Sequence, residues 1–212
     1  MFRSLAAGAV VAALFAAVSP AHGAPVPDVP PGKVVIDLET VNGSGCRKGT
    51  AAVAVASDNT AFTVTYSEYM ASSGAGAQPT DFRKNCQLNL NVHVPSGFTY
   101  AIASADYRGY GYLQRGAVGQ QRANYYFQGQ PQTTRKTHQF NGPWNDSWQA
   151  RDVTEIAQLV WAPCGEQRNF NINTELRVSA GSSSPQSTNF MTMDSTDASV
   201  STEYQLAWRK CS

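Results

Sequence analysis

The stretch Gln87-Leu88-Asn89-Leu90-Asn91-Val92-His93-Val94 decides the fold, because apolar and polar residues alternate along it without a break. Successive side chains on a β-strand point to opposite faces, so one face of this segment is apolar and the other polar. Such alternation is typical of a strand that covers a core on one side and meets solvent on the other. The segment therefore predicts a half-buried strand.

The same period of two recurs along the chain. Its repeating positions are Phe62/Val64/Tyr66, Phe98/Tyr100/Ile102, Ile172/Thr174/Leu176/Val178 and Tyr204/Leu206/Trp208, and residues 34–41 and 51–56 add two further expected strands. Turn-forming residues separate these runs, as in Asn42-Gly43, Ser57-Asp58-Asn59, Pro95-Ser96-Gly97 and Asn141-Gly142-Pro143. Many short strands with regular turns predict an all-β protein, an antiparallel β-sandwich that is jelly-roll-like and has little helix.

Two kinds of segment depart from this pattern. Residues 149–160 are the only candidate for a short helix, with Val153, Ile156 and Val160 on one side. Residues 72–77 and 181–187 are small and polar, so we expect surface loops there.

The N-terminal residues 1–23 have the features of a secretory signal peptide. Arg3 supplies the positive charge, an apolar run follows, and Ala21-His22-Gly23 supplies the small residues that signal peptidase needs. The apolar run is shorter than the roughly 20 residues that span a bilayer, so we expect no transmembrane anchor. We expect residues 24–32, which hold four prolines, to form an extended leader and residues 33–212 to form a single domain.

The charges of the expected mature chain balance. Removal of 23 of the 212 residues leaves 189, with 15 basic and 15 acidic side chains. No basic excess would draw the protein to nucleic acid or to an anionic membrane. We therefore predict a soluble, extracellular monomer.

The four cysteines indicate how the domain is held together. An even number in an exported chain is typical of disulfides, and no close Cys-x-x-Cys pair favours zinc. Four cysteines allow three pairings, between which spacing does not decide. We favour Cys46–Cys86 and Cys164–Cys211, which tie a strand in each half of the chain to a later one.

Ordered motifs across most of the mature chain point to a family. They include Asn85-Cys86-Gln87-Leu88-Asn89-Leu90, Asp106-Tyr107-Arg108-Gly109-Tyr110, Trp161-Ala162-Pro163-Cys164-Gly165 and the closing Trp208-Arg209-Lys210-Cys211. With these motifs the chain resembles a family of small secreted proteins from actinomycetes and filamentous fungi, known as domain of unknown function 4360. The resemblance implies secretion and a shared fold, and it carries no activity.

The most unusual stretch is Asp106-Tyr107-Arg108-Gly109-Tyr110-Gly111-Tyr112. Glycines between tyrosines would let the rings lie flat on a surface, where they could stack on sugars beside polar partners. The candidate ligand-binding residues are Asp106, Tyr107, Arg108, Tyr110, Tyr112, Trp144 and Trp148. The alternative is that the tyrosines are half-buried strand residues of the core.

A second candidate site is the acidic segment Asp194-Ser195-Thr196-Asp197. Its oxygens suit a calcium site, with Asp194 and Asp197 as ligands. The alternative is a turn whose side chains bond their own backbone. We expect no other cofactor.

No motif indicates catalysis, and we nominate no catalytic residue. His93 and His138 lack a supporting nucleophile or metal motif. Asp37 with Glu39, or Asp152 with Glu155, are the acid pairs that a glycosidase would need, but neither lies in a distinctive motif.

Three functions remain open from the sequence. The leading hypothesis is a non-catalytic extracellular binding or surface-associated module, with polysaccharide or cell wall as its ligand. The alternatives are an extracellular polysaccharide hydrolase or lyase, and a structural or inhibitory secreted protein.

Overall fold

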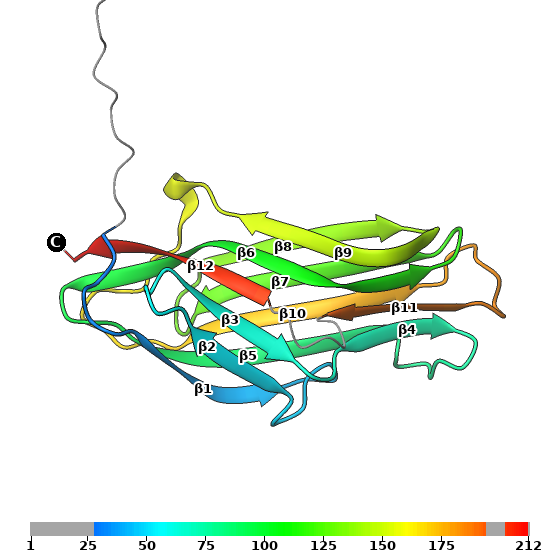
Figure 1. The fold of residues 1–212 in the computed structure, drawn as a ribbon, viewed down its shortest axis with the longest axis horizontal. Coiled ribbons are helices and arrows are strands. Elements are labelled where there is room, and N and C mark those ends of the chain that lie inside the picture. Colours follow the sequence, from blue (N-terminus) through cyan, green and yellow to red (C-terminus); the bar gives the residue numbers. More distant parts are fainter. Residues whose placement is uncertain (1–27, 194–201, 212) are drawn as a thin grey trace, which may run out of the picture.

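The computed structural model describes residues 28–193 and 202–211, which form two β-sheets packed face to face (Figure 1). The first sheet has the strand order β1-β5-β10-β7-β8, with β1 Val35–Asn42, β5 Arg83–His93, β10 Phe170–Ser179, β7 Val118–Phe127 and β8 Thr133–Asn141. The second has the order β2-β3-β12-β6-β11-β4, and β9 pairs with β6; these strands are β2 Ala51–Val55, β3 Ala61–Tyr66, β12 Thr202–Lys210, β6 Phe98–Leu113, β11 Thr188–Met193, β4 Met70–Gly74 and β9 Trp144–Val153. Neighbouring strands run antiparallel, so the predicted all-β sandwich is confirmed.

Strand β5 has the two faces that its sequence predicts. Cys86, Leu88, Leu90 and Val92 are buried, while the polar residues between them lie on the outer face of the sheet. The strand pairs with β1 on one side and β10 on the other, so it stands inside the five-stranded sheet. Alternation along one strand thus sets which face of this sheet covers the core.

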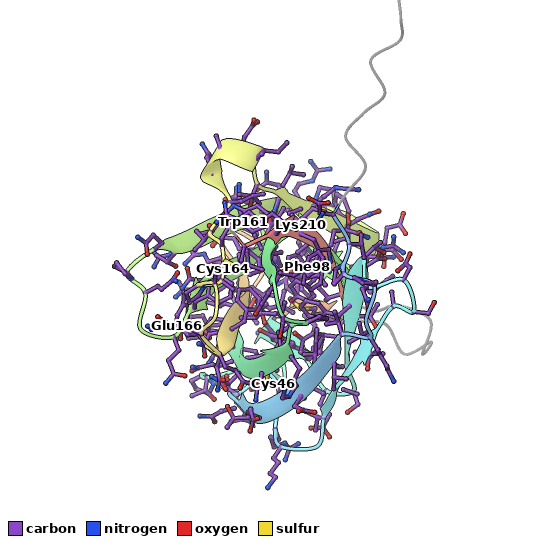
Figure 2. The ribbon with its side chains drawn as sticks, turned by 90° about the vertical axis from the view of Figure 1, so that its left-hand side faces the viewer. Cys46, Phe98, Trp161, Cys164, Glu166 and Lys210 are labelled. Atoms are coloured by element: carbon purple, nitrogen blue, oxygen red, sulfur yellow. A yellow bond between two sulfur atoms is a disulfide. The ribbon has the colours of Figure 1, made fainter. Side chains whose placement is uncertain are left out.

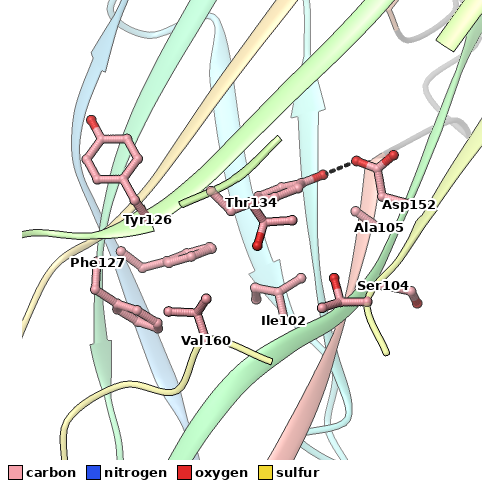
Figure 3. Close-up of a pocket in the computed structure, with 11 residues that line it drawn as sticks. Ile102, Ser104, Ala105, Tyr126, Phe127, Thr134, Asp152 and Val160 are labelled. Carbon is pink, nitrogen blue, oxygen red and sulfur yellow. Dashed lines mark hydrogen bonds between the residues drawn. The ribbon is translucent and has the colours of Figure 1, made fainter. Parts of the chain in front are cut away.

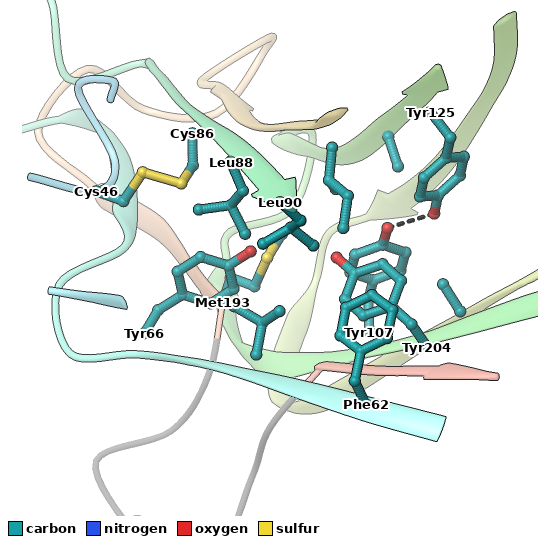
Figure 4. Packing of buried hydrophobic residues seen from close by; sticks show 14 of the residues in the cluster. Cys46, Phe62, Tyr66, Cys86, Leu88, Leu90, Tyr107, Tyr125, Met193 and Tyr204 are labelled. Atoms are coloured by element: carbon teal, nitrogen blue, oxygen red, sulfur yellow. Dashed lines mark hydrogen bonds between the residues drawn. A yellow bond between two sulfur atoms is a disulfide. The ribbon is translucent and has the colours of Figure 1, made fainter. Parts of the chain in front are cut away.

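The core between the sheets is rich in aromatic rings (Figure 4). The ring of Phe62 stacks on that of Tyr204, with centroids 4.7 Å apart, and the ring of Tyr107 meets Tyr204 edge-on at 6.0 Å. Leu88 and Leu90 of the facing sheet pack into the same cluster. Both sheets therefore contribute to one hydrophobic core.

Two disulfides join distant parts of the chain. Cys46 is bonded to Cys86 and Cys164 to Cys211, which is the pairing favoured from the sequence. At the end of the sandwich that faces the viewer in Figure 2, the second bridge ties the segment before β10 to the end of β12. The bridges close loops of 40 and 47 residues, a length for which chain entropy predicts about 4 kcal/mol of stabilisation each.

Residues 149–160 are not a helix of the expected length. Residues 149–153 belong to β9, in which buried Trp148, Ala150 and Asp152 alternate with exposed neighbours. Only the three residues Ile156–Gln158 form a 3-10 helix. The apolar spacing that imitated a helix arises where a strand ends and a turn begins.

Five strands were not foreseen from the sequence. The expected loop at residues 72–77 begins inside β4, which pairs with β11, and β7, β8 and β9 are the other strands without a prediction beside β11 itself. The residues of β4 are small, so their strand pairing depends on a partner distant in sequence. The expected loop at residues 181–187 does connect β10 to β11.

The described part of the proline-rich leader is anchored to the domain. The Asn59 side-chain amide donates to the carbonyl oxygens of Pro30, at 3.3 Å, and Gly32, at 2.7 Å. Its oxygen accepts a hydrogen bond from the Val34 amide at 3.1 Å. Pro30 is buried, so the leader is not free of the domain at residues 30–32.

Candidate functional site

Strand β6 carries most of the predicted ligand-binding residues and divides them between its two faces. Tyr107 is fully buried, and it lies in the core with its ring edge toward Tyr204. Arg108 is exposed, and Tyr110 and Tyr112 are half-buried on the outer face. Asp106, also on the outer face, is largely covered and has Arg151 3.6 Å away. The candidate residues therefore do not form one surface.

The prediction that Tyr107 and Trp148 belong to an exposed platform is wrong. Trp148 is 2% exposed, and its indole nitrogen donates to the Thr192 carbonyl at 3.0 Å. It lies over Gly109, where an added Cβ would stand 2.7 Å from the indole ring. The glycine between the tyrosines thus makes room for a tryptophan inside the sandwich and does not flatten rings on the surface.

Trp144 also faces the inner side of its strand. Its ring packs edge-on against Phe140 of β8, with centroids 5.6 Å apart. Its indole nitrogen donates to the Asp146 carbonyl at 3.0 Å. Trp144 therefore closes the edge between β8 and β9, and it does not extend the surface of Tyr110 and Tyr112.

The half-buried aromatic residues on the outer face of β6 form a small cluster with a residue that the sequence did not reveal. The ring of Phe190 lies opposite Tyr112 on β11 and stacks on both Tyr112, at 5.8 Å, and Tyr110, at 6.2 Å. We call Tyr110, Tyr112 and Phe190 the aromatic cluster. Because the rings stack on one another, the faces that meet inside the cluster are not open to a ligand.

A series of hydrogen bonds between polar side chains crosses the core from β6 to β8. The hydroxyls of Tyr107 and Tyr125 are hydrogen-bonded (Figure 4), and Tyr125 donates to Asp152 Oδ2 at 2.5 Å (Figure 3). The other oxygen of Asp152 lies 2.6 Å from His138 Nε2. Burial raises the pKa of both tyrosine hydroxyls well above the usual range, with the nearby Asp152 charge adding to the effect. His138 therefore has a structural partner.

The cavity beside these hydrogen bonds is too small for a sugar. Its volume is about 20 Å³, room for about one water molecule, and among the residues that the structure describes Asp152 is the only carboxylate that lines it. Glu155 is exposed in the segment that follows β9, and Asp37 lies on β1 at 2.7 Å from His93. Asp152 is buried whereas Glu155 is exposed, and Asp37 and Glu39 are exposed neighbours on the single strand β1. Neither pair is therefore placed as two acids on opposite sides of a sugar, the arrangement that cleavage of a glycosidic bond uses.

The outer face of the five-stranded sheet is built differently. Its strands place amide and guanidinium side chains in register, because Gln87 pairs with Asn173, Asn173 with Asn124, and Asn124 with Arg135. These four residues, which we call the polar row, come from β5, β10, β7 and β8. Strands lie about 4.8 Å apart, so three spacings extend the polar row over about 14 Å.

Much of the hydrogen-bonding capacity of the polar row is unused. Within residues 28–193 and 202–211, no side-chain hydrogen bond involves Gln87, Asn173 or Arg135. By contrast, Asn89 donates to Asn171 at 3.0 Å in the next row of the same face. A buried acceptor without a partner is costly, and Asn173 Oδ1 is one.

The polar row crosses a hollow of about 310 Å³ on the sheet surface. Most of its lining residues carry polar side chains, and among the described residues they combine amides and arginines with the single carboxylate of Glu175. The lining residues are Arg83, Asn85, Cys86, Gln87, Arg122, Ala123, Asn124, Arg135, Asn173, Thr174 and Glu175. The disulfide of Cys86 holds the base of this hollow to Cys46. We call this feature the polar hollow.

The sequence contained only part of the signal for the polar hollow. The alternating Gln87, Asn89 and Asn91 were recognised as the polar face of a strand, which is usually a solvated face. Arg122, Arg135 and Asn173 lie far apart in the chain, and only the strand register brings them together.

The proposed calcium ligands Asp194 and Asp197 lie outside the described residues. In the described part of the chain, no three His, Cys, Asp or Glu side chains gather as a metal site would need. Nor does any helix within residues 28–193 and 202–211 have the length and apolar character to cross a membrane.

Comparisons with known proteins identify relatives. The model of a family described as "Domain of unknown function (DUF4360)" matches residues 32–211. A relative from Arthroderma benhamiae, named "Uncharacterized secreted protein", is 35% identical over 189 residues, which cover 89% of this chain and 76% of the relative. Among solved structures, a chain of the cowpea mosaic virus top component covers 81% of this chain and 87% of its own length at 12% identity; its TM-score of 0.24 supports no argument.

Proposed function

The chain is a secreted protein that belongs to the family described as Domain of unknown function (DUF4360), and we propose that it is a non-catalytic module that binds polysaccharide. The ligand would be a polymer of a cell wall or of the extracellular surroundings. It would lie in the polar hollow on the outer face of the five-stranded sheet.

The polar row is the observation that carries this proposal. Each amide offers both a donor and an acceptor, and a guanidinium offers five donors, so the row matches the hydroxyls of a sugar chain. Gln87, Asn173 and Arg135 have no side-chain partner among the described residues that a ligand would need to displace. A sugar hydroxyl bound there would satisfy groups that the fold leaves open.

The position of the polar row on paired strands also favours binding. Four neighbouring strands hold these side chains, and the Cys46–Cys86 disulfide fixes the chain below them. Side chains on paired strands are held more precisely than side chains on loops, so less conformational entropy is lost when a ligand binds.

The proposal is tested by retention of the protein on a panel of insoluble polysaccharides and on a glycan array. We expect Asn173→Leu to weaken binding to the retained polymer about tenfold, which corresponds to about 1.4 kcal/mol. Gln87→Leu should weaken the same binding by a smaller factor, because Gln87 is at the end of the row.

The matched control is Gln149→Leu. Gln149 is also an exposed glutamine on a strand, but it lies on β9 of the other sheet. The Gln149→Leu variant should bind the polysaccharide as the wild type does. Thermal unfolding should confirm that every variant is folded. Failure of the wild type to bind any polymer would refute the proposal and favour a structural or inhibitory role. Equal losses in Gln149→Leu and Asn173→Leu would also refute it.

A further inference from the structure

We infer that the polar hollow recognises a polysaccharide that bears carboxylates, a polyuronate, in preference to a neutral one. This inference rests on the proposed function and names the class of ligand for the same site. Its basis is the charge of the lining, where three arginines, Arg83, Arg122 and Arg135, stand against the single acid Glu175.

Glu175 is already occupied by arginines. Its side chain is 13% exposed, Arg83 bonds one of its oxygens, and Arg177 donates to the other at 2.7 Å. Arg122 approaches the same carboxylate at 3.5 Å. The one negative charge is therefore surrounded by positive charge, and the hollow as a whole keeps a positive excess.

Arg135 is the arginine of the hollow that has no partner. Arg83 and Arg122 are held by Glu175, and Arg122 also donates to Gln120 at 2.8 Å. Within residues 28–193 and 202–211, the guanidinium of Arg135 makes neither a hydrogen bond nor an ion pair. A guanidinium binds a carboxylate with two parallel hydrogen bonds, so Arg135 is suited to receive one from a ligand.

The neighbours of Arg135 suit the rest of a sugar acid. Arg135 stands directly opposite Asn124, which stands opposite Asn173, so the charged end of the polar row continues into amides. A uronic acid carries one carboxylate and several hydroxyls on one ring. A chain lying along the row would place carboxylates near Arg135 and Arg122 and hydroxyls near the amides.

The charge is local to this face and is not a property of the whole protein. The chain has 16 basic and 15 acidic residues, so long-range attraction to polyanions is weak. Preference for a carboxylated polymer would therefore depend on the arginines of the hollow. Removal of one arginine elsewhere on the surface should leave the preference unchanged.

The experiment compares polygalacturonate with its fully methyl-esterified form, because the two share a backbone and differ in charge. Binding is measured by affinity electrophoresis at low and at physiological salt, with polyglutamate as a polyanion that lacks sugar hydroxyls. We expect polygalacturonate to bind at least tenfold more tightly than its ester and polyglutamate to bind weakly. Arg135→Gln should bring the ratio of the affinities for the two polysaccharides close to one, because polygalacturonate should lose more affinity than its ester does.

The control is Arg108→Gln, which removes the same charge from an exposed position on β6 of the other sheet. It should keep the wild-type ratio. Equal binding of both polysaccharides, or binding of neutral polymers alone, would refute the inference and leave the proposed function standing. Tight binding of polyglutamate, or loss of the preference for polygalacturonate in Arg108→Gln, would show that the preference comes from unspecific charge attraction. Either result would also refute the inference. Absence of binding to every polymer would refute both proposals.

Discussion

The outer face of the five-stranded sheet and strand β6 of the opposite sheet show two uses of the same alternation. On β6, the inward residues Tyr107 and Gly109 pack the core, and the outward Tyr110 and Tyr112 stack on Phe190. On the five-stranded sheet, the outward residues of the polar row are amides and an arginine, and the side chains of Gln87, Asn173 and Arg135 have no hydrogen-bond partner among the described residues.

The difference teaches that an unusual composition is a weak guide to a binding site. The tyrosines and glycines of β6 attract notice, yet their contacts are satisfied within the protein by Trp148, Tyr204 and Phe190. The amides of the polar row are ordinary in sequence, but among the described residues the structure leaves the side chains of Gln87 and Asn173 without hydrogen-bond partners. A candidate site is distinguished by hydrogen-bonding groups that the fold leaves without partners, and not by an unusual residue composition.

The largest expected effect concerns the tyrosines inside the sandwich. Burial raises the pKa of Tyr69, Tyr100, Tyr107, Tyr125 and Tyr204. The folded state favours the neutral form of these tyrosines. Their contribution to the free energy of unfolding is therefore fully present below about pH 10, the pKa of tyrosine in the unfolded chain, and it is lost as the pH rises above that value. Each such group can lower the unfolding free energy by about 1.4 kcal/mol per pH unit there.

Denaturant unfolding between pH 8 and pH 11.5 measures this effect. Stability should change little from this cause up to about pH 9.5 and then fall steeply. Tyr100→Phe removes one buried hydroxyl and should make the decline less steep. A stability that stays level to pH 11.5 would contradict the assignment of these tyrosines to the core.

The next effect concerns the glycines of β6. A Cβ at Gly109 would collide with the backbone oxygen of Thr192 and stand 2.7 Å from the Trp148 ring, so Gly109→Ala should destabilise the fold by about 3 kcal/mol. At Gly111 the nearest atom, in the Trp144 ring, is 3.2 Å away, and Gly111→Ala should cost about 1 kcal/mol or less. Thermal unfolding compares the two; equal effects would show that packing of Trp148 does not explain the glycine.

The smallest expected effect distinguishes the outer face of β6, which should contribute only to stability, from the outer face of the five-stranded sheet, which should bind the ligand. Tyr112→Ser removes one ring from the aromatic cluster and should cost about 1 kcal/mol of stability, because its stacking on Phe190 is lost. Tyr112→Ser should leave polysaccharide binding unchanged. Asn173→Leu should weaken polysaccharide binding and leave the stability of the fold unchanged. Parallel measurements of unfolding and retention test this; a binding defect in Tyr112→Ser would return the ligand site to β6.

Sequence patterns predicted much of the framework for physical reasons that are local. The alternation in β5 and β12 depends only on neighbours two residues apart, and it correctly indicated which side chains enter the core. The strands β8 and β9 were missed because their polar and aromatic residues show that pattern less clearly. The apparent helix at residues 149–160 combined the end of β9 with a 3-10 turn.

By itself the sequence determined that the chain is an all-β sandwich, and it indicated the apolar and polar faces of strands such as β5 and β12, since side-chain direction alternates along any strand. Only the tertiary structure decided which strands lie side by side and in what register. That choice buried Tyr107 and Trp148, and it aligned Gln87, Asn124, Arg135 and Asn173. The reason is that pairing between distant strands depends on the packing of the whole core, which no local pattern contains.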